Sequence, residues 1–464
     1  MKVVVIGGGI SGLSAAYRLK QSGAEVTVLE AETRPVGKIR TESVDGFLVE
    51  HGPNGFLDSR QPVLDLVRDL RLDNQLVRAN EEAKRRYIYT RGALRPLPGG
   101  PISLLATRLL SARGLLRLAW EPFVKPKADF SVDETVFDFA ARRIGPEAAR
   151  VMVDAMVTGV YAGDSRALSL RAAFPKMFEL EKTYGSLVKA LIALMKARKA
   201  NASSAAGPAG KLTSFPEGLE TLVHALARRL EGHVVLGRRA VALSRDAGSG
   251  TPWQVRLDDG GVVEGDAVVL STPAAAMAEL VASHAPAAAD ALRAIPYNPA
   301  AVVAFGYPPG SLPRPLDGFG YLVPGQEGRK ILGCVWCSSL FAGRATRGRA
   351  LIRSIVGGAR HPELVGLDDP TLSAVVTSEL SIVMGGVMPT APFQRVIRWP
   401  QAIPQYTLGH LERVAAVEAG LQTVGGLFTA TNALHGVSLS DCIARAERLP
   451  ALVLQGERHD SPRR

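Results

Sequence analysis

The sequence is poor in cysteines and aromatic residues and lacks a long uncharged apolar run. Three cysteines in 464 residues argue against a disulfide scaffold and suit a reducing cytosol. Cys334 and Cys337 form a single C-x-x-C without a second pair, so a zinc site is not expected. No uncharged apolar run reaches about 18 residues, so no helix is expected to span a membrane. No Ser/His/Asp triad and no metal-ligand cluster is visible, and we predict no metal site.

The charges lean to the basic side without forming a block. There are 55 Lys and Arg against 44 Asp and Glu, a net charge of +11. This excess suits an acidic ligand, an anionic membrane surface or nucleic acid. With 6% aromatic residues and no nucleic-acid-binding motif, a nucleic-acid partner is not expected. A strand and a glycine motif begin at once, so we expect no signal peptide and a cytoplasmic protein.

The first thirty residues predict a dinucleotide-binding unit. Lys2 to Ile6 is an apolar, β-branched run, typical of a strand buried on both faces of a parallel sheet. Residues 7–12 fit G-x-G-x-x-G, a helical pattern follows, and Glu25 to Leu29 predicts a second strand. Glycine allows the tight turn, the close approach of the backbone to a pyrophosphate and the packing of the helix on the strand. The predicted site comprises Gly7, Gly9, Ser11, Gly12, Glu30 and Ala31, with Glu30 accepting hydrogen bonds from a ribose.

Residues 30–41 resemble the second fingerprint of the FAD-containing amine oxidase and protoporphyrinogen oxidase superfamily, an acid followed by R-x-G-G-[RK]-x-x-T. The match keeps Arg34, Gly37, Lys38 and Thr41 and departs at Val36, where the family usually has glycine. Further departures come late in the chain, where Thr431 replaces a glycine and Ser440 an asparagine.

Several later motifs resemble oxygen-dependent protoporphyrinogen oxidases, including the bacterial coproporphyrinogen-oxidising branch. They are E-H-G-P-N-G-F at 50–56, R-G-A-L at 91–94, G-V-Y-A-G-D at 159–164, G-F-G-Y-L-V-P at 318–324, I-P-Q-Y-T-L-G-H at 403–410 and G-V-S-L-S-D-C-I at 436–443. The likeness extends from the first strand to about Leu454.

The resemblance implies an α/β fold, α+β overall. It comprises a Rossmann-like FAD-binding domain of the amine oxidase/glutathione reductase type, a mixed-sheet substrate domain and a helical domain for which membrane association is an open alternative. The expected FAD-binding parts are residues 1–80, 211–294 and 399–464, the last including a C-terminal tail after Pro450. The expected substrate-binding parts are residues 81–100 and 295–398, and the helical part is residues 101–210.

The resemblance also implies the site residues. Non-covalent FAD would be held by the residues already named and by Gly37, Lys38, Gly52, Pro53, Asn54, Gly55, Val241, Trp399, Val437, Ser438 and Leu439. A tetrapyrrole substrate would meet Arg86, Gly159, Phe319 and Leu322, with the Arg86 guanidinium gripping a propionate as a two-pronged fork. His51 and His410 are interpreted as structural, and no catalytic acid or base is assigned.

We therefore expect a flavin-dependent oxidase. Hydride would pass from the porphyrinogen to flavin N5, and O2 would reoxidise the flavin to give H2O2, in three rounds that yield protoporphyrin IX from protoporphyrinogen IX. Coproporphyrinogen III is the alternative substrate. Another FAD oxidase, such as an amine oxidase or carotenoid desaturase, and a catalytically silent flavoprotein also stay open.

Residues 104–120 predict one amphipathic helix. Leu105, Leu109, Ala112, Leu116 and Trp120 would share a face, with Arg113 and Arg117 lying away from it. Such a helix fits either a packed core or peripheral attachment to a membrane surface. A homodimer is also left open.

Overall fold

The computed structural model describes residues 1–460 except for 36, 101–102, 104–105, 201–209 and 246–250. Position 36, where the second fingerprint departs from its pattern, lies outside the described residues. None of the described helices is long and apolar enough to cross a membrane.

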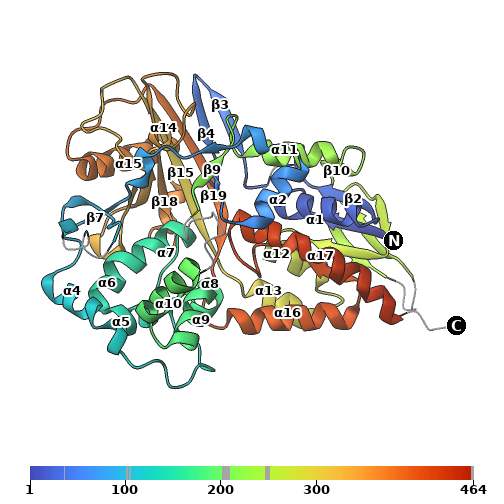
Figure 1. Cartoon of the computed structure of the whole chain (residues 1–464). Helices are drawn as coiled ribbons and strands as arrows, with labels where there is room; N and C mark the ends of the chain where they lie inside the picture. The colour runs from blue at the N-terminus through green and yellow to red at the C-terminus, as the bar shows by residue number, and fades with distance from the viewer. Residues whose placement is uncertain (36, 101–102, 104–105, 201–209, 246–250, 461–464) are drawn as a thin grey trace.

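The glycine motif follows the strand β1 of a five-stranded parallel sheet. This sheet lies on the right in Figure 1. The strand order is β10-β2-β1-β14-β20. The bounds are β1 Lys2–Ile6, β2 Glu25–Glu30, β10 Val234–Leu236, β14 Ala267–Leu270 and β20 Leu427–Thr429. β1 has four successive buried residues, as expected for a strand covered on both faces. The predicted Rossmann-like parallel sheet is confirmed.

Helices cover both faces of this sheet. One face packs against α1 Ile10–Gln21, α11 Glu220–Arg229 and α17 Leu439–Asp460. The other packs against α12 Ala274–Val281, α13 Pro286–Arg293 and α16 His410–Val424, together with the small sheet of β11 Ala240–Ser244, β12 Trp253–Leu257 and β13 Val262–Gly265.

A second, seven-stranded sheet is mixed. Its order is β19-β15-β18-β17-β16-β7-β8, with β16 parallel to β7 and the other pairs antiparallel. The bounds are β7 Tyr87–Thr90, β8 Ala93–Pro96, β15 Tyr297–Tyr307, β16 Gly320–Leu322, β17 Ile331–Val335, β18 Ala350–Gly357 and β19 Phe393–Pro404. Helix α15 Asp369–Met384 covers one face, and the hairpin of β3 Thr41–Val44 and β4 Phe47–Glu50 packs on the other. Smaller elements are α2 Gln61–Asp69, α14 Cys337–Leu340 and the sheet of β5 Phe56–Leu57, β9 Leu212–Ser214 and β6 Val77–Arg78.

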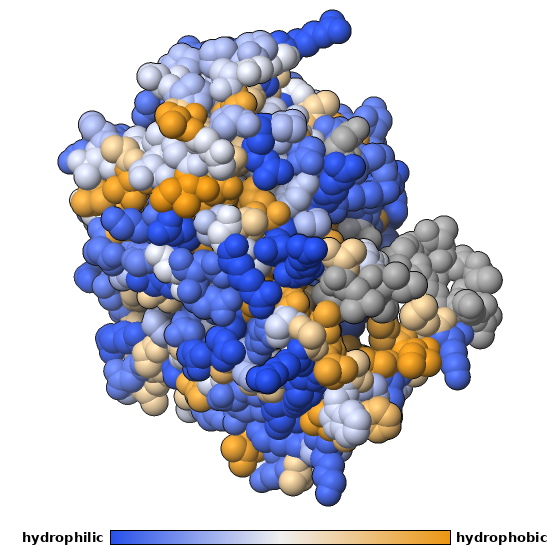
Figure 2. All heavy atoms as spheres, turned by 90° about the vertical axis from the view of Figure 1, so that its left-hand side faces the viewer, coloured by the Kyte–Doolittle hydropathy of each residue, from blue (hydrophilic) through white to orange (hydrophobic). Residues whose placement is uncertain are grey.

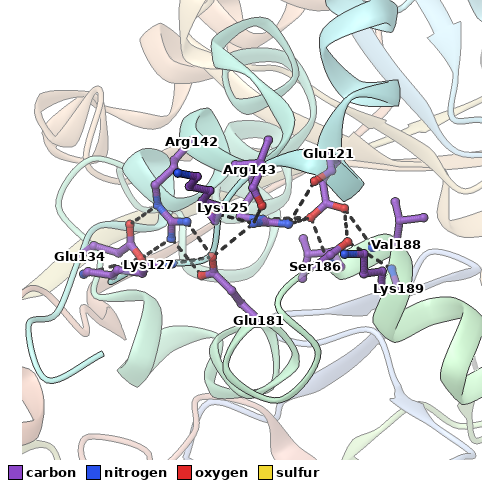
Figure 3. A network of polar contacts seen from close by, with 12 residues as sticks. Glu121, Lys125, Lys127, Glu134, Arg142, Arg143, Glu181, Ser186, Val188 and Lys189 are labelled. Carbon is purple, nitrogen blue, oxygen red and sulfur yellow. Dashed lines mark hydrogen bonds and ion pairs between the residues drawn. The ribbon is translucent and has the colours of Figure 1, made fainter. Parts of the chain in front are cut away.

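A helical region lies at the lower left in Figure 1. It contains α4 Ala112–Ala119, η3 Glu121–Phe123, α5 Val136–Ile144, α6 Pro146–Ala148, the π-helical turn η4 Ala149–Val153, α7 Asp154–Tyr161, α8 Leu170–Ala173, α9 Pro175–Tyr184 and α10 Leu187–Ala200. A network of buried ion pairs centred on Arg143 and Glu121 joins η3, α5, α9 and α10 (Figure 3). Through Ile88 and Leu322 the region also packs on the β7 and β16 end of the mixed sheet.

The single helix predicted over residues 104–120 is wrong. Arg108 has a φ of +52°, which ends any helix before it, and Ser111 caps a new helix, α4, by accepting a hydrogen bond from the amide of Gly114. Leu109 and Leu110, between the break and the cap, are buried. The sequence pattern did not show this break because no glycine or proline marks it.

The tail predicted after Pro450 is also wrong, because α17 continues through Pro450 to Asp460. Leu449 and Val453 are buried in the same core as α1, so packing outweighs the hydrogen bond that the proline removes.

Candidate cofactor and substrate site

The glycine loop has no space for side chains at the turn from β1 into α1. Gly7 has a φ of +112°, and a Cβ on Gly12 would overlap the carbonyl oxygen of Gly7. Ser271 and Thr272, at the end of β14, lie against the same turn, and their buried hydroxyls have no partner in the described structure. A pyrophosphate can accept hydrogen bonds from backbone amides and from hydroxyl groups, so this loop and the two unpaired hydroxyls beside it fit a pyrophosphate.

Glu30 stands at the end of β2, beside this loop. One carboxylate oxygen accepts a hydrogen bond from the Gly8 amide at 2.6 Å, and the other accepts one from the Glu32 amide at 2.9 Å. Because an ionised carboxylate offers about four acceptor sites, Glu30 can still accept protons from two hydroxyls. Ala31 follows it directly and is exposed.

Val241 lies on β11, and its side chain is 42% exposed. The chain enters β11 next to Glu30, since the Arg238 amide donates to the carbonyl of Glu30 at 3.0 Å. The structure thus places both residues at the same edge of the parallel sheet.

Lys38 connects the second fingerprint to the end of β19. Its Nζ donates to the carbonyl of Ala402 at 2.6 Å and lies 5.4 Å from the centre of the Tyr297 ring. Burial lowers the pKa of Lys38 to about 8. The preceding residue, Gly37, packs so closely on the glycine loop that a Cβ on it would lie 3.1 Å from the Cα of Gly9.

The start of α17 completes this group. Cys442 in its first turn interacts with the Ser11 hydroxyl and lies near Lys38, and burial raises the pKa of its thiol to about 11. Val437, Ser438 and Leu439 form the approach to this helix, and Ser438 Oγ donates to the Asp441 carboxylate at 2.6 Å. The helix N-terminus therefore presents its partial positive charge to the same region as Ser11 and Lys38.

Residues 52–55 are held from three sides. A Cβ on Gly52 would overlap the carbonyl of Lys38, and one on Gly55 would overlap that of Thr213. The Arg353 guanidinium on β18 donates to the carbonyl of Gly52 at 2.9 Å and to the side chain of Asn54. Pro53 lies between these two anchored residues. The G-P-N segment is therefore a fixed turn next to Lys38.

His51 precedes this turn. Its carbonyl accepts a hydrogen bond from Trp399 Nε1 at 2.9 Å, and its imidazole lies 3.3 Å from Glu42. The net effect of burial and its neighbours lowers the pKa of His51. His410 begins α16, is buried and stacks on Tyr406. Both side chains therefore contact other groups of the protein.

Arg86, Phe319, Leu322 and Gly159, the four predicted substrate residues, lie around the end of β7 and β16. The exposed guanidinium of Arg86 lies 5.0 Å from the centre of the Phe319 ring, and the Phe319 amide donates to the carbonyl of Arg85 at 2.7 Å. A Cβ on Gly159 would lie 2.9 Å from the nearest methyl of Leu322. In the described part of the chain no carboxylate pairs with Arg86.

Two side chains behind Gly159 fix α7 in place. Asp154 receives hydrogen bonds from Arg360 at 2.6 Å and from the Gly325 amide at 2.8 Å, and Arg360 also donates to Thr158. Asp154, Arg360 and Arg353 were not predicted from the sequence, because each contacts residues far away in the chain.

A separate open cavity of about 1210 Å³ lies between α15, the edge strand β19 and the β3–β4 hairpin. Arg34, Glu42, His51, Asp369 and Arg395 give it a polar and charged lining. It contains none of the predicted cofactor or substrate residues, so we do not place the chemistry there.

Known proteins resemble this chain over nearly its whole length. The family model for flavin containing amine oxidoreductase matches residues 10–449. A coproporphyrinogen III oxidase of Bacillus subtilis is 30% identical over 95% of both chains. A chloroplastic protoporphyrinogen oxidase of Oryza sativa is 33% identical over 96% of this chain and 86% of its own.

The chain belongs to the protoporphyrinogen and coproporphyrinogen oxidase family of flavin-containing amine oxidoreductases. The solved structure of a candidate protoporphyrinogen oxidase from Exiguobacterium agrees, with a TM-score of 0.82, 25% identity and coverage of 98% of this chain and 99% of the other. A putrescine oxidase structure at 15% identity and a TM-score of 0.72 shares the fold of this wider family.

The residues that the structure brings together fit the family's flavin. The glycine cradle, the unpaired hydroxyls of Ser271 and Thr272, the buried cation of Lys38 and the N-terminus of α17 all suit an anionic dinucleotide. The individual FAD and substrate contacts stay predictions.

Proposed function

We propose that this protein is an FAD-dependent oxidase that converts protoporphyrinogen IX to protoporphyrin IX with O2, releasing H2O2, in haem biosynthesis. The observation that carries the proposal is the group of Arg86, Phe319, Leu322 and Gly159, in a chain whose relatives are named for porphyrinogen oxidation. A tetrapyrrole with carboxylate arms needs an apolar wall and a cation at its rim, and these four residues supply both.

Each of these residues has a distinct task in the proposed reaction. Arg86 binds a propionate at the rim, and the Phe319 ring beneath it keeps the guanidinium in position. Leu322 contributes an apolar wall, and glycine at 159 leaves space next to it because any side chain there would press on Leu322. The Asp154–Arg360 pair holds α7, and so the backbone of Gly159, against the mixed sheet.

The bound flavin would supply the redox chemistry, accepting electrons from the porphyrinogen and passing them to O2. The protein's residues would bind and orient the flavin. The pyrophosphate would be bound by Gly7, Gly9, Ser11, Gly12, Gly37 and Lys38, and the adenosine by Glu30, Ala31 and Val241. The isoalloxazine ring would be bound by Gly52, Pro53, Asn54, Gly55, Trp399, Val437, Ser438 and Leu439. We assign no protein acid or base, since burial lowers the pKa of His410 to about 4 and the imidazole of His51 faces Glu42.

Coproporphyrinogen III is the second candidate substrate, because relatives named for each substrate are similarly distant from this chain. Parallel assays of porphyrin fluorescence with both porphyrinogens on the FAD-loaded protein decide between them. Faster turnover of protoporphyrinogen IX supports the proposal. Faster turnover of coproporphyrinogen III makes the second candidate correct. A primary amine that bleaches the flavin without O2 would instead support another amine oxidase-like activity.

We further propose a cytoplasmic location with peripheral attachment to a membrane surface. Leu116 in α4, Phe123 in η3 and Trp120 between the two helices are 72%, 70% and 61% exposed, and the Trp120 and Phe123 rings lie 5.0 Å apart. Arg113 and Lys125 flank them in the sequence. Figure 2 shows the face that includes α4, where apolar side chains gather in separate groups among hydrophilic ones. Such a surface favours shallow contact rather than insertion. A homodimer stays a prediction.

A further inference from the structure

Arg353 is a buried arginine that none of the sequence motifs explains. It lies within β18 in the otherwise mostly apolar run ALIRSIVG and is 2% exposed. Both ends of its guanidinium donate to the turn at Gly52 and Asn54, and its Nε has no partner in the described structure. A guanidinium is charged at any ordinary pH, so a positive charge is fixed in the interior behind this turn.

The surrounding groups leave this charge largely uncompensated. Glu50 is a buried carboxylate whose charge interacts with both Arg353 and Arg344; it receives hydrogen bonds from Thr41 and Leu219 and lies 3.9 Å from Arg344. A second buried carboxylate, Glu220, accepts a hydrogen bond from the Thr41 amide and lies 3.8 Å from Arg34. Arg344 is itself 2% exposed and donates to the carbonyls of Phe215 and Pro216, so two guanidinium groups face one carboxylate.

The other titratable neighbours add no negative charge. Burial raises the pKa of the Cys337 thiol, and it raises that of Cys334 to about 12, so both are neutral. His51 has a lowered pKa and is neutral near pH 7. Arg353 and Arg344 therefore outnumber Glu50, the carboxylate that interacts with both of them.

We propose that Arg353 fixes the Gly52–Asn54 turn against the flavin and supplies the ring with a buried positive charge. An isoalloxazine ring gains negative charge when it is reduced, and a positive charge in a poorly screened interior stabilises that state. Arg353 is a positioning residue, since its hydrogen bonds go to the turn. The inference rests on the family's flavin and on the predicted place of residues 52–54 beside it. It does not depend on which substrate is oxidised.

Sulfite affinity of the FAD-loaded protein tests this inference without any porphyrinogen. Sulfite forms an N–S bond at flavin N5 and leaves negative charge on the ring, so its affinity reports the nearby electrostatic field. We expect Arg353→Gln and Arg353→Met to bind sulfite at least about tenfold more weakly, and Arg353→Lys to stay within about threefold of the wild type. The matched control is Arg344→Gln, which removes an equally buried guanidinium that does not touch the turn and should also stay within about threefold.

Unchanged sulfite affinity in both neutral variants would overturn the inference, as would a loss in Arg353→Lys equal to that in Arg353→Gln. If both neutral variants lose FAD and Arg353→Lys keeps it, the anchoring role is supported. Sulfite affinity of the Lys variant then decides the charge: a value near the wild type supports it, and a tenfold loss contradicts it. Failure of the proposed substrate would appear only in porphyrinogen assays, so the two failures are distinguishable.

Discussion

At the scale of single residues, Lys38 predicts a pH dependence of FAD binding. Its pKa of about 8 in the flavin-free protein means that it is charged below pH 8 and neutral above. If it faces the pyrophosphate, FAD affinity should fall as pH rises through 8, by up to about tenfold per pH unit. Fluorescence titration of the apoprotein with FAD between about pH 7 and pH 9.5 measures this.

The matched variant for this prediction is Lys38→Arg, which stays charged over the same range and should show a flat pH profile. A wild-type affinity that does not change across pH 8, or an equal slope in the Arg variant, would contradict the role given to Lys38.

Arg86 predicts a defect in substrate binding. Losing a charge-assisted hydrogen bond costs about 1.5–3 kcal/mol, so Arg86→Ala should raise KM by about tenfold to a hundredfold with little change in kcat. Arg85→Ala is the control, because Arg85 is exposed next to it and lies 3.3 Å from Asp317 instead. Steady-state kinetics with porphyrinogen measure both, and an unchanged KM in Arg86→Ala removes this residue from the proposed site.

The residues that act within one short segment were predictable from sequence. Gly7 and Gly12 contact each other across a single turn, and the sequence motif of residues 7–12 predicts that turn. Arg353 was not predictable, because its partners Gly52 and Asn54 precede it by about three hundred positions and no local pattern links them. The hydrogen bond between Lys38 and Ala402 was likewise not predictable from local sequence, although Lys38 itself was predicted as a site residue.

At the scale of elements, the helical region depends on one buried network. The side chains of Glu121 and Arg143 are fully buried, and Glu121 also accepts hydrogen bonds from Ser186 at 2.6 Å and from the amides of Leu187 and Val188 at the start of α10 (Figure 3). Arg142 pairs with Glu134 and Glu181 in the same network. The Glu121 carboxylate thus joins η3, α5 and α10, and Glu181 of α9 joins the same network through Arg142 and Arg143.

Glu121→Ala should therefore destabilise the protein strongly. It leaves Arg143 buried without its main partner, at a cost of about 3–5 kcal/mol. Burial alone would raise the pKa of Glu121, but hydrogen bonds from Ser186 and Arg143 make the net change downward. Its contribution is thus present above the pKa of the unfolded chain and is lost as pH falls below it. Urea unfolding followed by circular dichroism measures the change.

The exposed pair of Glu81 with Lys84 provides the comparison, and Glu81→Gln should leave the urea midpoint unchanged. Equal midpoints for Glu121→Ala and the wild type would mean that the network does not stabilise the fold.

Local patterns predicted strands β1 and β2 well and missed the break near residue 108. Strands β1 (KVVVI) and β2 (EVTVLE) are mostly apolar and β-branched after a charged first residue. The apolar pattern over residues 104–120 gives no information on backbone conformation. A positive φ at Arg108 and a helix cap at Ser111 divide this segment. Tertiary burial of Leu109 and Leu110 decides the outcome there.

At the scale of the whole molecule, α4 and η3 predict weak, salt-sensitive binding to anionic vesicles. Replacing both Trp120 and Phe123 by Ser removes two exposed aromatic side chains and should weaken binding to phosphatidylglycerol vesicles by at least about tenfold. Val387→Ser, which changes an 89% exposed side chain in the lining of the separate polar cavity, should have no effect. Sedimentation with vesicles measures both, and equal binding of the double variant would contradict peripheral attachment through this surface.

The assembly of the sheets could be predicted only in part. The parallel sheet takes its strands from residues 2–6, 25–30, 234–236, 267–270 and 427–429, and the order β10-β2-β1-β14-β20 comes from contacts between distant segments. The resemblance to a family implied a Rossmann-like domain built from three separate parts of the chain, and the strand order within it was not predicted. The division of the chain into six domain segments stays a prediction.

Anaerobic reduction shows whether a porphyrinogen delivers its electrons to a flavin bound by this protein. The FAD-loaded protein is mixed with protoporphyrinogen IX or coproporphyrinogen III without O2, and the flavin absorbance and porphyrin fluorescence are followed together. We expect the flavin to bleach with at least one of them, O2 to restore its colour, and three flavin reductions to accompany each porphyrin formed. A flavin that keeps its colour with both porphyrinogens would contradict the account.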